Sequence, residues 1–325
     1  MKIIFCGTPD YAVSSLRRIL RLEPLHQVVA VVSQPDKPKG RSRTPSPPPV
    51  VAAARDMGMT PDCIFQPRSI NQREILDALG ALAPDLLCVV AYGKILKEEA
   101  LHLARLFPIN AHASLLPRYR GAAPIQAALL AGESETGVSI IKMEADLDSG
   151  PVMLRRSLQI NAADDAGSLH DKLADLSADC FEEAIHAIEA ENFLFTAQDE
   201  SLATYAPKLT KESGCIDWLK DADFLERFVR AMNPWPGAWT TIALKDGSHK
   251  QRVRVAGAGL DGAPASNAEA GLARVSVDDV MKVACGGGGS LTILRIQPEG
   301  KRMLNMAEYL RGAGRIYVPE ARLGV

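Results

Sequence analysis

A short segment near the middle of the chain places three polar side chains at intervals of two residues. Asn110-Ala111-His112-Ala113-Ser114 follows an apolar run at residues 107–109, so it reads as the end of a buried strand. Strand side chains alternate between faces, so Asn110, His112 and Ser114 should point the same way. Because polar side chains on a buried face need partners, this pattern predicts a site and not part of a core.

The residue types suit the transfer of an acyl group to an amine. The amide of Asn110 and the imidazole of His112 can hold a developing oxyanion. Asp148, in the segment Leu147-Asp148-Ser149-Gly150, adds a carboxylate that can orient the imidazole and help to move a proton. Taken singly, His112 could be a hydrogen-bonded core residue and Asp148 a turn residue. Their combination favours a catalytic set of Asn110, His112 and Asp148.

The composition is that of an ordinary globular chain. Its 325 residues suffice for two domains, and 47% of them are hydrophobic. No apolar run approaches the ~20 residues that span a bilayer, and the N-terminal apolar segment is too short for a signal peptide. The six cysteines are scattered without a C-x-x-C pair, so no disulfide framework or zinc site is indicated. We therefore expect a cytoplasmic protein that uses no metal.

Strand-like and helix-like segments alternate through the first part of the chain. Apolar, strand-like runs occupy residues 2–6, 28–33, 85–92 and 108–112, and helical patterns occupy residues 11–22, 50–57, 72–82, 125–130 and 164–192. This rhythm predicts an α/β domain with a doubly wound, Rossmann-like sheet. The first turn, Gly7-Thr8-Pro9-Asp10, lacks the G-x-G-x-x-G pattern and argues against a nicotinamide site. Ligands of such sheets bind beyond the carboxyl ends of the strands, where Tyr92 and His112 lie.

The pattern changes after about residue 206. Short alternating runs at residues 252–256, 273–277, 280–284 and 291–296 are separated by glycine-rich turns, with helical patterns at residues 224–232 and 306–311. Closely spaced strands of this kind predict an OB-like β-barrel as a C-terminal domain. We expect a catalytic domain at residues 1–206, with a linker from about residue 193, and a barrel domain at residues 207–325.

Two basic regions indicate a polyanionic partner. The net charge is −2, yet residues 207–325 carry 17 Lys or Arg against 13 Asp or Glu. After the second predicted strand, Lys37, Lys39, Arg41 and Arg43 precede a proline-rich stretch whose composition rules out regular structure. Long loops at this edge of a sheet are more often functional than not. The alternatives are a random charge fluctuation and a solvated linker.

These motifs resemble those of the formyltransferases that use 10-formyltetrahydrofolate. The resemblance is carried by Asn110-x-His112-x-Ser114-Leu115-Leu116-Pro117, by residues 120–126, by Thr136-Gly137-Val138 and by Leu147-Asp148-x-Gly150. The blocks Gly7-Thr8-Pro9-Asp10 and Asn233-Pro234-Trp235-Pro236 point to the branch of the family that acts on initiator methionyl-tRNA. Matching segments occur along nearly the whole chain.

The resemblance implies a reaction and a set of roles. The formyl group of the co-substrate 10-formyltetrahydrofolate passes to the α-amino group of methionine on initiator methionyl-tRNA, which supports translation initiation. Asn110, His112 and Asp148 are then catalytic. The folate pocket is expected to be formed by Val90, Tyr92, Gly93, Ser114, Leu115, Leu116 and Pro117. The tRNA is expected to be contacted by Lys37, Lys39, Arg41, Arg43 and Arg118. The basic loop lacks the Lys-Lys pair expected after Gly40-Arg41, so its individual contacts are not assigned.

Other interpretations remain open at this stage. A formyltransferase acting on a small amine, such as a sugar nucleotide or glycinamide ribonucleotide, would share the three catalytic residues but would not need the basic loop. A non-catalytic RNA-binding module is disfavoured by the intact catalytic set. Trp235 and Trp239 could stack on bases, although proline-bounded tryptophans more often wedge a domain interface or a barrel entrance. We expect the protein to be a monomer.

Overall fold

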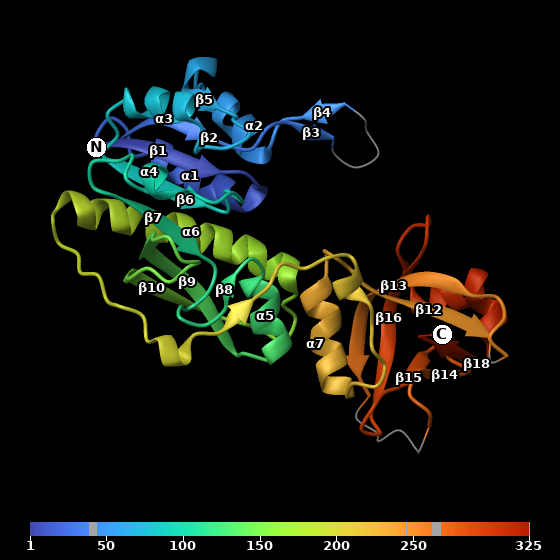
Figure 1. Cartoon of the computed structure of the whole chain (residues 1–325). Coiled ribbons are helices and arrows are strands. Elements are labelled where there is room, and N and C mark those ends of the chain that lie inside the picture. Colours follow the sequence, from blue (N-terminus) through green and yellow to red (C-terminus); the bar gives the residue numbers. More distant parts are fainter. Residues whose placement is uncertain (39–43, 245, 262–267, 325) are drawn as a thin grey trace. The chain divides into compact units, whose positions relative to one another are not determined.

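The computed structural model describes residues 1–38, 44–244, 246–261 and 268–324, which form two compact units (Figure 1). The first unit comprises residues 1–124, 135–159 and 170–206. The second comprises residues 125–134, 160–169 and 207–325. The last passage of the chain from one unit to the other therefore falls between Ala206 and Pro207.

The first unit is built on a seven-stranded sheet with the order β10-β9-β7-β6-β1-β2-β5. Its parallel strands are β1 (Lys2–Gly7), β2 (Gln27–Val32), β5 (Ile64–Phe65), β6 (Leu86–Val90) and β7 (Phe107–His112). The antiparallel strands β9 (Glu135–Lys142) and β10 (Val152–Gln159) complete one edge. The predicted α/β class is confirmed. Strands β9 and β10 are not predicted from the sequence. In β9, Gly137 and Ser139 interrupt the apolar run, and in β10 the exposed Arg155 and Arg156 do so.

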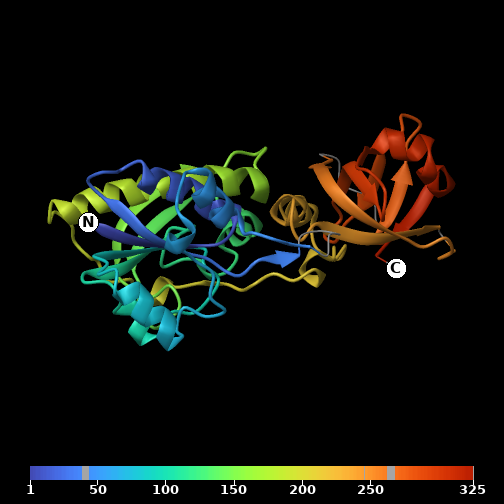
Figure 2. The ribbon, with the colours of Figure 1, turned by 90° about the horizontal axis from the view of Figure 1, so that it is seen from above.

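Helices cover both faces of this sheet. They are α1 (Val13–Leu20), α2 (Pro49–Asp56), α3 (Arg73–Gly80), α4 (Glu98–Leu101) and α6 (Ala166–Glu189). Helix α5 (Pro124–Ala131) belongs, from residue 125 on, to the second unit. Figure 2 shows α6 on one side of the sheet and α3 and α4 on the other. A core cluster joins Ile4, Val32 and Val89 of the strands to Leu79 of α3 and Leu101 of α4. The predicted doubly wound arrangement is thus present, with apolar strands buried between two helical layers.

The second unit is a closed β-barrel. Its strands are β12 (Ala238–Leu244), β13 (Gln251–Leu260), β14 (Leu272–Val275), β15 (Met281–Ala284), β16 (Ser290–Pro298), β17 (Leu304–Asn305) and β18 (Glu320–Leu323). They follow the order β13-β12-β18-β14-β15-β16-β17, and a further pairing of β13 with β16 closes the barrel. Closure pairs strand edges that an open sheet would leave exposed. The predicted OB-like barrel is confirmed.

Two helices of the second unit begin at capped residues. Asp221 accepts a hydrogen bond from the backbone of Phe224 (2.7 Å) at the start of α7 (Ala222–Met232). Asn305 and Glu308 form a capping box at the start of α8 (Met306–Arg311). Short 3-10 turns lie at Asp10–Ala12, Pro61–Cys63, Glu200–Leu202, Glu212–Gly214 and Ala313–Tyr317.

Among the described residues, no helix has the length and apolar character needed to cross a membrane.

The basic loop contains regular structure at its base, contrary to the prediction. Strands β3 (Lys37–Pro38) and β4 (Pro45–Ser46) pair with each other as an antiparallel ribbon (Figure 1). Proline removes a backbone donor, but a two-residue ribbon at a protein surface does not need every ladder bond. Lys37 is paired with Ser46 in this ribbon. Lys39, Arg41 and Arg43 lie outside the described residues.

A buried histidine next to the start of β2 makes stability depend on pH. His26 has no exposed surface. Its Nδ1 lies 3.4 Å from the amino group of Met1 and its Nε2 lies 3.2 Å from Glu189 Oε2, with the His186 ring in edge contact. Burial lowers the pKa of His26, although Glu189 acts in the opposite direction. The unfolded chain therefore binds a proton that the folded chain does not, and stability decreases as pH falls.

We expect the free energy of unfolding to decrease between about pH 7.5 and pH 5.5, the range around the unfolded pKa of histidine. His26→Gln should remove part of this decrease, because it removes the group that protonates on unfolding. Urea denaturation at several pH values measures the effect, with His102→Gln at an exposed position as the matched control. Identical pH slopes for wild type and His26→Gln would contradict the assignment.

Candidate active site

The predicted catalytic strand residues lie at the carboxyl end of β7. Asn110 is paired with Val89 of β6 and with Ile141 of β9, and His112 is paired with Ser139 of β9. Their spacing of two residues places both side chains on one face of the sheet. The neighbouring β6 ends at Val90, so the site forms where two adjacent parallel strands end.

Each ring nitrogen of His112 faces an oxygen atom. Nε2 lies 2.9 Å from the backbone oxygen of Tyr119, and Nδ1 lies 3.5 Å from Oδ2 of Asp148. A carbonyl oxygen can only accept, so Nε2 carries a hydrogen. An imidazolium satisfies both oxygens, whereas the neutral form with hydrogen on Nε2 turns a lone pair toward the carboxylate. The side chain is only 7% exposed, so water screens these interactions little.

Asp148 is held in a strained turn by a glutamine that the sequence does not identify. Its φ of 51° lies in the left-handed region, and its Oδ2 accepts a hydrogen bond from the backbone of Gly121 (2.8 Å). Gln198 Nε2 donates to the backbone oxygens of Asp148 (2.8 Å) and Gly150 (2.7 Å). A Cβ at Gly150 would lie 1.8 Å from the oxygen of Lys142, so this turn has no room for a side chain.

A buried arginine fixes Gln198 in turn. Arg120 is 2% exposed and donates through Nη2 to Gln198 Oε1 (2.8 Å) and to Glu200 Oε1 (2.6 Å). The hydrogen bond to Glu200 raises the pKa of Arg120, so this cation is permanent. Arg120 and Gly121 form β8 (Arg120–Gly121), which pairs in parallel with β11 (Tyr205–Ala206). The region around Gln198 reads as a polar linker in the sequence, which gives no signal for this role.

Asn110 keeps its donor available for a ligand. Its residue is partly exposed, and within the described part of the chain its side-chain amide makes no hydrogen bond. Ser114, the third polar residue of the motif, has a different role. Its Oγ donates to the backbone oxygen of Arg118 (2.6 Å), and its backbone oxygen accepts from Ser139 Oγ (2.7 Å). Ser114 thus organises the loop after β7.

A cavity of about 760 Å³ lies beside Asp148. Its apolar lining includes Ile95, Leu96, Ile141 and Met143. Its polar lining includes Arg68, Asn71, Lys94, Glu144, Asp146 and Asp148, and Gly93 and Gly150 also border it. The volume falls within the roughly 300–1,000 Å³ typical of small-molecule sites. The apolar walls suit a flat heterocycle, and the charged lining combines the cations Arg68 and Lys94 with the acids Glu144, Asp146 and Asp148.

The residues predicted for the folate pocket occupy different places. Gly93 lines the cavity, in a left-handed turn with φ 73°. Val90 and Tyr92 are buried, and burial raises the pKa of the Tyr92 hydroxyl. The backbone oxygen of Tyr92 accepts hydrogen bonds from Thr8 Oγ1 and Gln34 Nε2, both at 2.9 Å. In the loop after β7, Ser114 and Leu116 are buried and Leu115 and Pro117 are partly buried. Arg68, Asn71, Ile95 and Met143 of the cavity are not identified from the sequence.

The described residues of the predicted tRNA set are Lys37 and Arg118. Lys37 Nζ donates to Gln34 Oε1 (2.7 Å), next to the turn after β6. Arg118 is exposed, donates through Nη2 to the Tyr119 hydroxyl (2.9 Å) and lies over that ring at 5.0 Å.

His26, His186 and Glu189 lie close enough to one another to share an ion, and none of them belongs to the catalytic set.

Known proteins and family models match this chain over nearly its whole length. A family model described as Formyl transferase matches residues 1–185, and one described as Formyl transferase, C-terminal domain, matches residues 208–314. The methionyl-tRNA formyltransferase of Geobacter sulfurreducens is 41% identical over 324 residues, covering 100% of this chain and 97% of that protein. The methionyl-tRNA formyltransferase of Methylococcus capsulatus is 44% identical over 311 residues, covering 95% of this chain and 96% of that protein.

A solved structure extends the similarity to the fold. WlaRD, described as a sugar 3N-formyl transferase in the presence of dTDP and 5-N-formyl-THF, superposes with a TM-score of 0.64. Its sequence is 16% identical, and the match covers 93% of this chain and 99% of that one. At this identity the match concerns the fold alone. The family models and the full-length relatives carry the assignment further: the chain belongs to the formyltransferase family and, within it, to the methionyl-tRNA formyltransferases.

Proposed function

We propose that the protein transfers the formyl group of 10-formyltetrahydrofolate to the α-amino group of methionine on initiator methionyl-tRNA. The observation that supports this most directly is His112, held between the Tyr119 oxygen and Asp148, on the same face as the amide of Asn110. The product amide forms by acyl transfer, and an oxyanion donor, an imidazole and a carboxylate are the groups that this reaction uses.

The three side chains have distinct tasks in the mechanism. Attack of the amine on the formyl carbon places negative charge on the formyl oxygen, where Asn110 donates a hydrogen bond and a cationic His112 stabilises the charge. Asp148 holds the imidazole and accepts the proton released by the amine, which can pass through water to N10 of the departing folate. Gln198 and Arg120 are positioning residues, because they hold the turn that carries Asp148.

The cavity beside Asp148 fits the folate co-substrate, which supplies the formyl group. Its apolar residues Ile95, Ile141 and Met143 can pack against the flat ring system. Arg68 and Lys94 can pair with carboxylates of the glutamate tail. We retain the predicted contribution of Val90, Tyr92, Gly93 and residues 114–117 as a proposal. Buried members of this set would act by shaping the backbone that contacts the ligand.

The tRNA side of the site is a proposal drawn from charge. Lys37, Lys39, Arg41, Arg43 and Arg118 are proposed to bind phosphates, since cations on surface loops neutralise a nucleic-acid backbone. We propose that residues 1–206 perform the chemistry and that residues 207–325 add tRNA contacts. We further propose that the protein acts as a monomer, in the cytoplasm where translation is initiated.

The function is tested by a substrate comparison. Purified protein and 10-formyltetrahydrofolate are assayed with charged initiator tRNA, charged elongator methionine tRNA, free methionine and an amino-sugar nucleotide. We expect efficient formylation of the charged initiator tRNA and little formylation of free methionine or the amino-sugar nucleotide, because the proposed phosphate contacts orient only a tRNA-linked amine. The elongator tRNA measures the discrimination between the two tRNAs. Preferential formylation of the amino sugar would overturn the proposal.

Removal of the catalytic groups should reduce the chemical step. Asn110→Ala, His112→Ala and Asp148→Ala should each lower kcat by roughly a hundredfold or more, as expected when an oxyanion donor or an acid–base group is removed. Single-turnover formylation measures this, and the double variants should be far from additive because the groups act together. His102→Ala is the matched control, since His102 is exposed and has no role in the proposed site. Near-normal turnover of His112→Ala would rule out this assignment.

Neutralising the basic loop should weaken tRNA binding. Substitution of Lys37, Lys39, Arg41 and Arg43 by Ala should raise the KM for tRNA and reduce the salt dependence of binding by roughly one slope unit for each phosphate that the variant no longer binds. Folate binding, measured by fluorescence titration, serves as the internal control and should be unchanged. A salt slope equal to that of wild type would identify the loop as a plain linker.

A further inference from the structure

A row of polar side chains crosses three strands of the barrel. Trp239 of β12 is paired with Arg254 of β13, and Arg254 is paired with Gln297 of β16. Arg252 lies two residues before Arg254 and therefore shares its face. The intervening Val253 and the following Val255 are buried in the barrel core. Strict alternation thus places apolar residues inside and an aromatic and cationic row outside.

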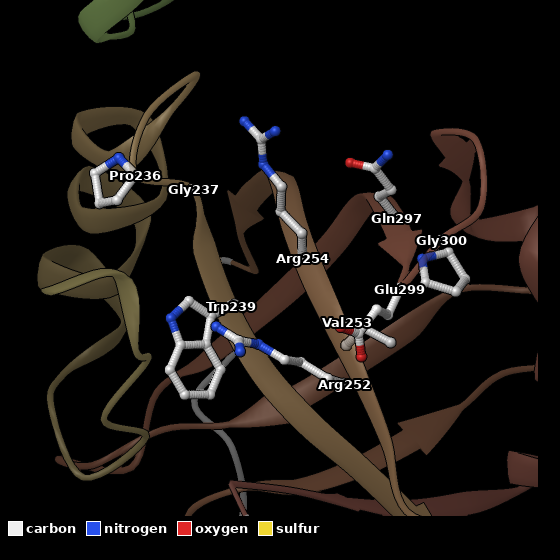
Figure 3. Close-up of a pocket in the computed structure, with 10 residues that line it drawn as sticks. Pro236, Gly237, Trp239, Arg252, Val253, Arg254, Gln297, Glu299 and Gly300 are labelled. Carbon is white, nitrogen blue, oxygen red and sulfur yellow. The ribbon is translucent and has the colours of Figure 1, made fainter. Parts of the chain in front are cut away.

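Trp239 and Arg252 form a planar stack. The Arg252 guanidinium lies 3.7 Å from the centre of the Trp239 ring system, and Figure 3 shows it lying across the indole. The indole is fixed by a hydrogen bond from its Nε1 to the Lys211 backbone oxygen (3.0 Å). Arg252 is exposed, and among the described residues its guanidinium makes no ion pair or hydrogen bond. Its outer face is a flat, cationic surface of the kind on which nucleic-acid bases stack.

Arg254 is oriented by the Asn-Pro-Trp-Pro segment. Its Nη2 donates to Asn233 Oδ1 (2.7 Å) and to the Pro234 backbone oxygen (2.8 Å). The buried Nε has no partner in the described structure, and a buried donor without a partner calls for an explanation. Gly237 has φ 89°, and a Cβ there would lie 2.9 Å from Nε, so the turn leaves space for this guanidinium. Trp235 of the same segment is 51% exposed.

The row borders a cavity with a positive surround. The cavity of about 270 Å³ is lined by Trp239, Arg252, Arg254, Gln297 and Glu299, together with Pro236 and Gly237 (Figure 3). Burial lowers the pKa of Arg254, and the positive charge of Arg295 lowers it further. Two acids oppose this positive charge. Glu299 lines the cavity, and Glu212 lies close enough to Arg252 for their charges to interact. The three arginines exceed these two acids, so the surface favours an anion.

We propose that Trp239, Arg252 and Arg254 form a subsite for one nucleotide of the bound tRNA. A base stacks on the outer face of Arg252, which Trp239 supports. The adjoining phosphate accepts hydrogen bonds from Nη1 of Arg254, because Nη2 already donates to Asn233 and Pro234 and Nε is buried. The row offers one stacking surface, on Arg252, and one free guanidinium edge, on Arg254, which together provide for one nucleotide. This inference rests on the proposed function, since it takes the anion to be the tRNA substrate, and it assigns a role to the Asn-Pro-Trp-Pro segment as the support of Arg254.

The test compares charge-matched variants of one barrel. Arg252→Gln and Arg254→Gln each remove one cation from the row, and Arg274→Gln removes one from β14, where Arg274 pairs with Glu320. Dissociation constants for charged initiator tRNA are measured over a range of salt concentrations, together with kcat and KM for formylation. Trp239→Phe keeps an aromatic ring, Trp239→Leu does not, and tRNA-induced quenching of tryptophan emission is followed in both and in wild type.

The proposal predicts how each variant changes tRNA binding and formylation. Arg252→Gln and Arg254→Gln should raise the Kd and the KM for tRNA roughly tenfold, with kcat at saturation retained, and Arg254→Gln should reduce the salt slope by about one. Arg274→Gln should change neither. Trp239→Phe should retain more affinity than Trp239→Leu, and both should show less quenching than wild type. If Arg252→Gln and Arg254→Gln both behave like Arg274→Gln while wild type formylates initiator tRNA, the subsite is refuted and the proposed function stands. If wild type formylates only a small amine, the proposed function fails instead.

Discussion

The position of one carboxylate depends on a guanidinium that does not line the substrate cavity. Arg120 is buried and neutralised by Glu200, and it holds Gln198, which in turn binds both ends of the turn that carries Asp148. A buried cation deprived of its partner would destabilise the fold by several kcal/mol, so this network is either complete or disrupted as a whole. The left-handed backbone of Asp148 persists because these contacts over-determine it. The carboxylate that faces His112 is therefore positioned by a chain of hydrogen bonds that begins at Arg120.

The parts of this architecture that depend on local pattern can be predicted from the sequence. Residue alternation places Asn110 and His112 together, and the apolar runs identify the parallel strands around them. Gln198 cannot be found in this way, because its hydrogen bond to Asp148 spans 50 positions of the chain and its neighbourhood looks like a polar linker. The residues that line the cavity beside Asp148 cannot be found from local pattern either. Arg68 and Met143 reach it from segments with no motif, and only the packing of the sheet brings them near Gly93.

Local composition also gives a wrong prediction where a few hydrogen bonds are enough to form a strand. Proline in the basic loop argues against strands, yet two residues on each side form a ribbon at its base. Conversely, β9 is a buried strand whose apolar residues are interrupted by Gly137 and Ser139, so it does not show the continuous apolar run of a buried strand. In strand β13 of the barrel, the alternation of polar and apolar residues is visible in the sequence. Arg252, Val253, Arg254 and Val255 alternate, and the same alternation that builds the core presents the arginines on the outer face. Packing and recognition thus use the two faces of a single strand.

The parallel pair β8–β11 has a mechanical consequence. Ala206, the last residue of the first unit, is hydrogen-bonded through its backbone oxygen to Ala122 (2.9 Å), beside the Gly121 amide that binds Asp148. A pull on the chain beyond Pro207 loads this short ladder before it reaches the carboxylate. The ladder ends on Gly121, whose amide holds Asp148, so such a load reaches the carboxylate through the hydrogen bonds of the β8–β11 pair. The pair therefore couples the segment that leaves the first unit to the backbone around Asp148.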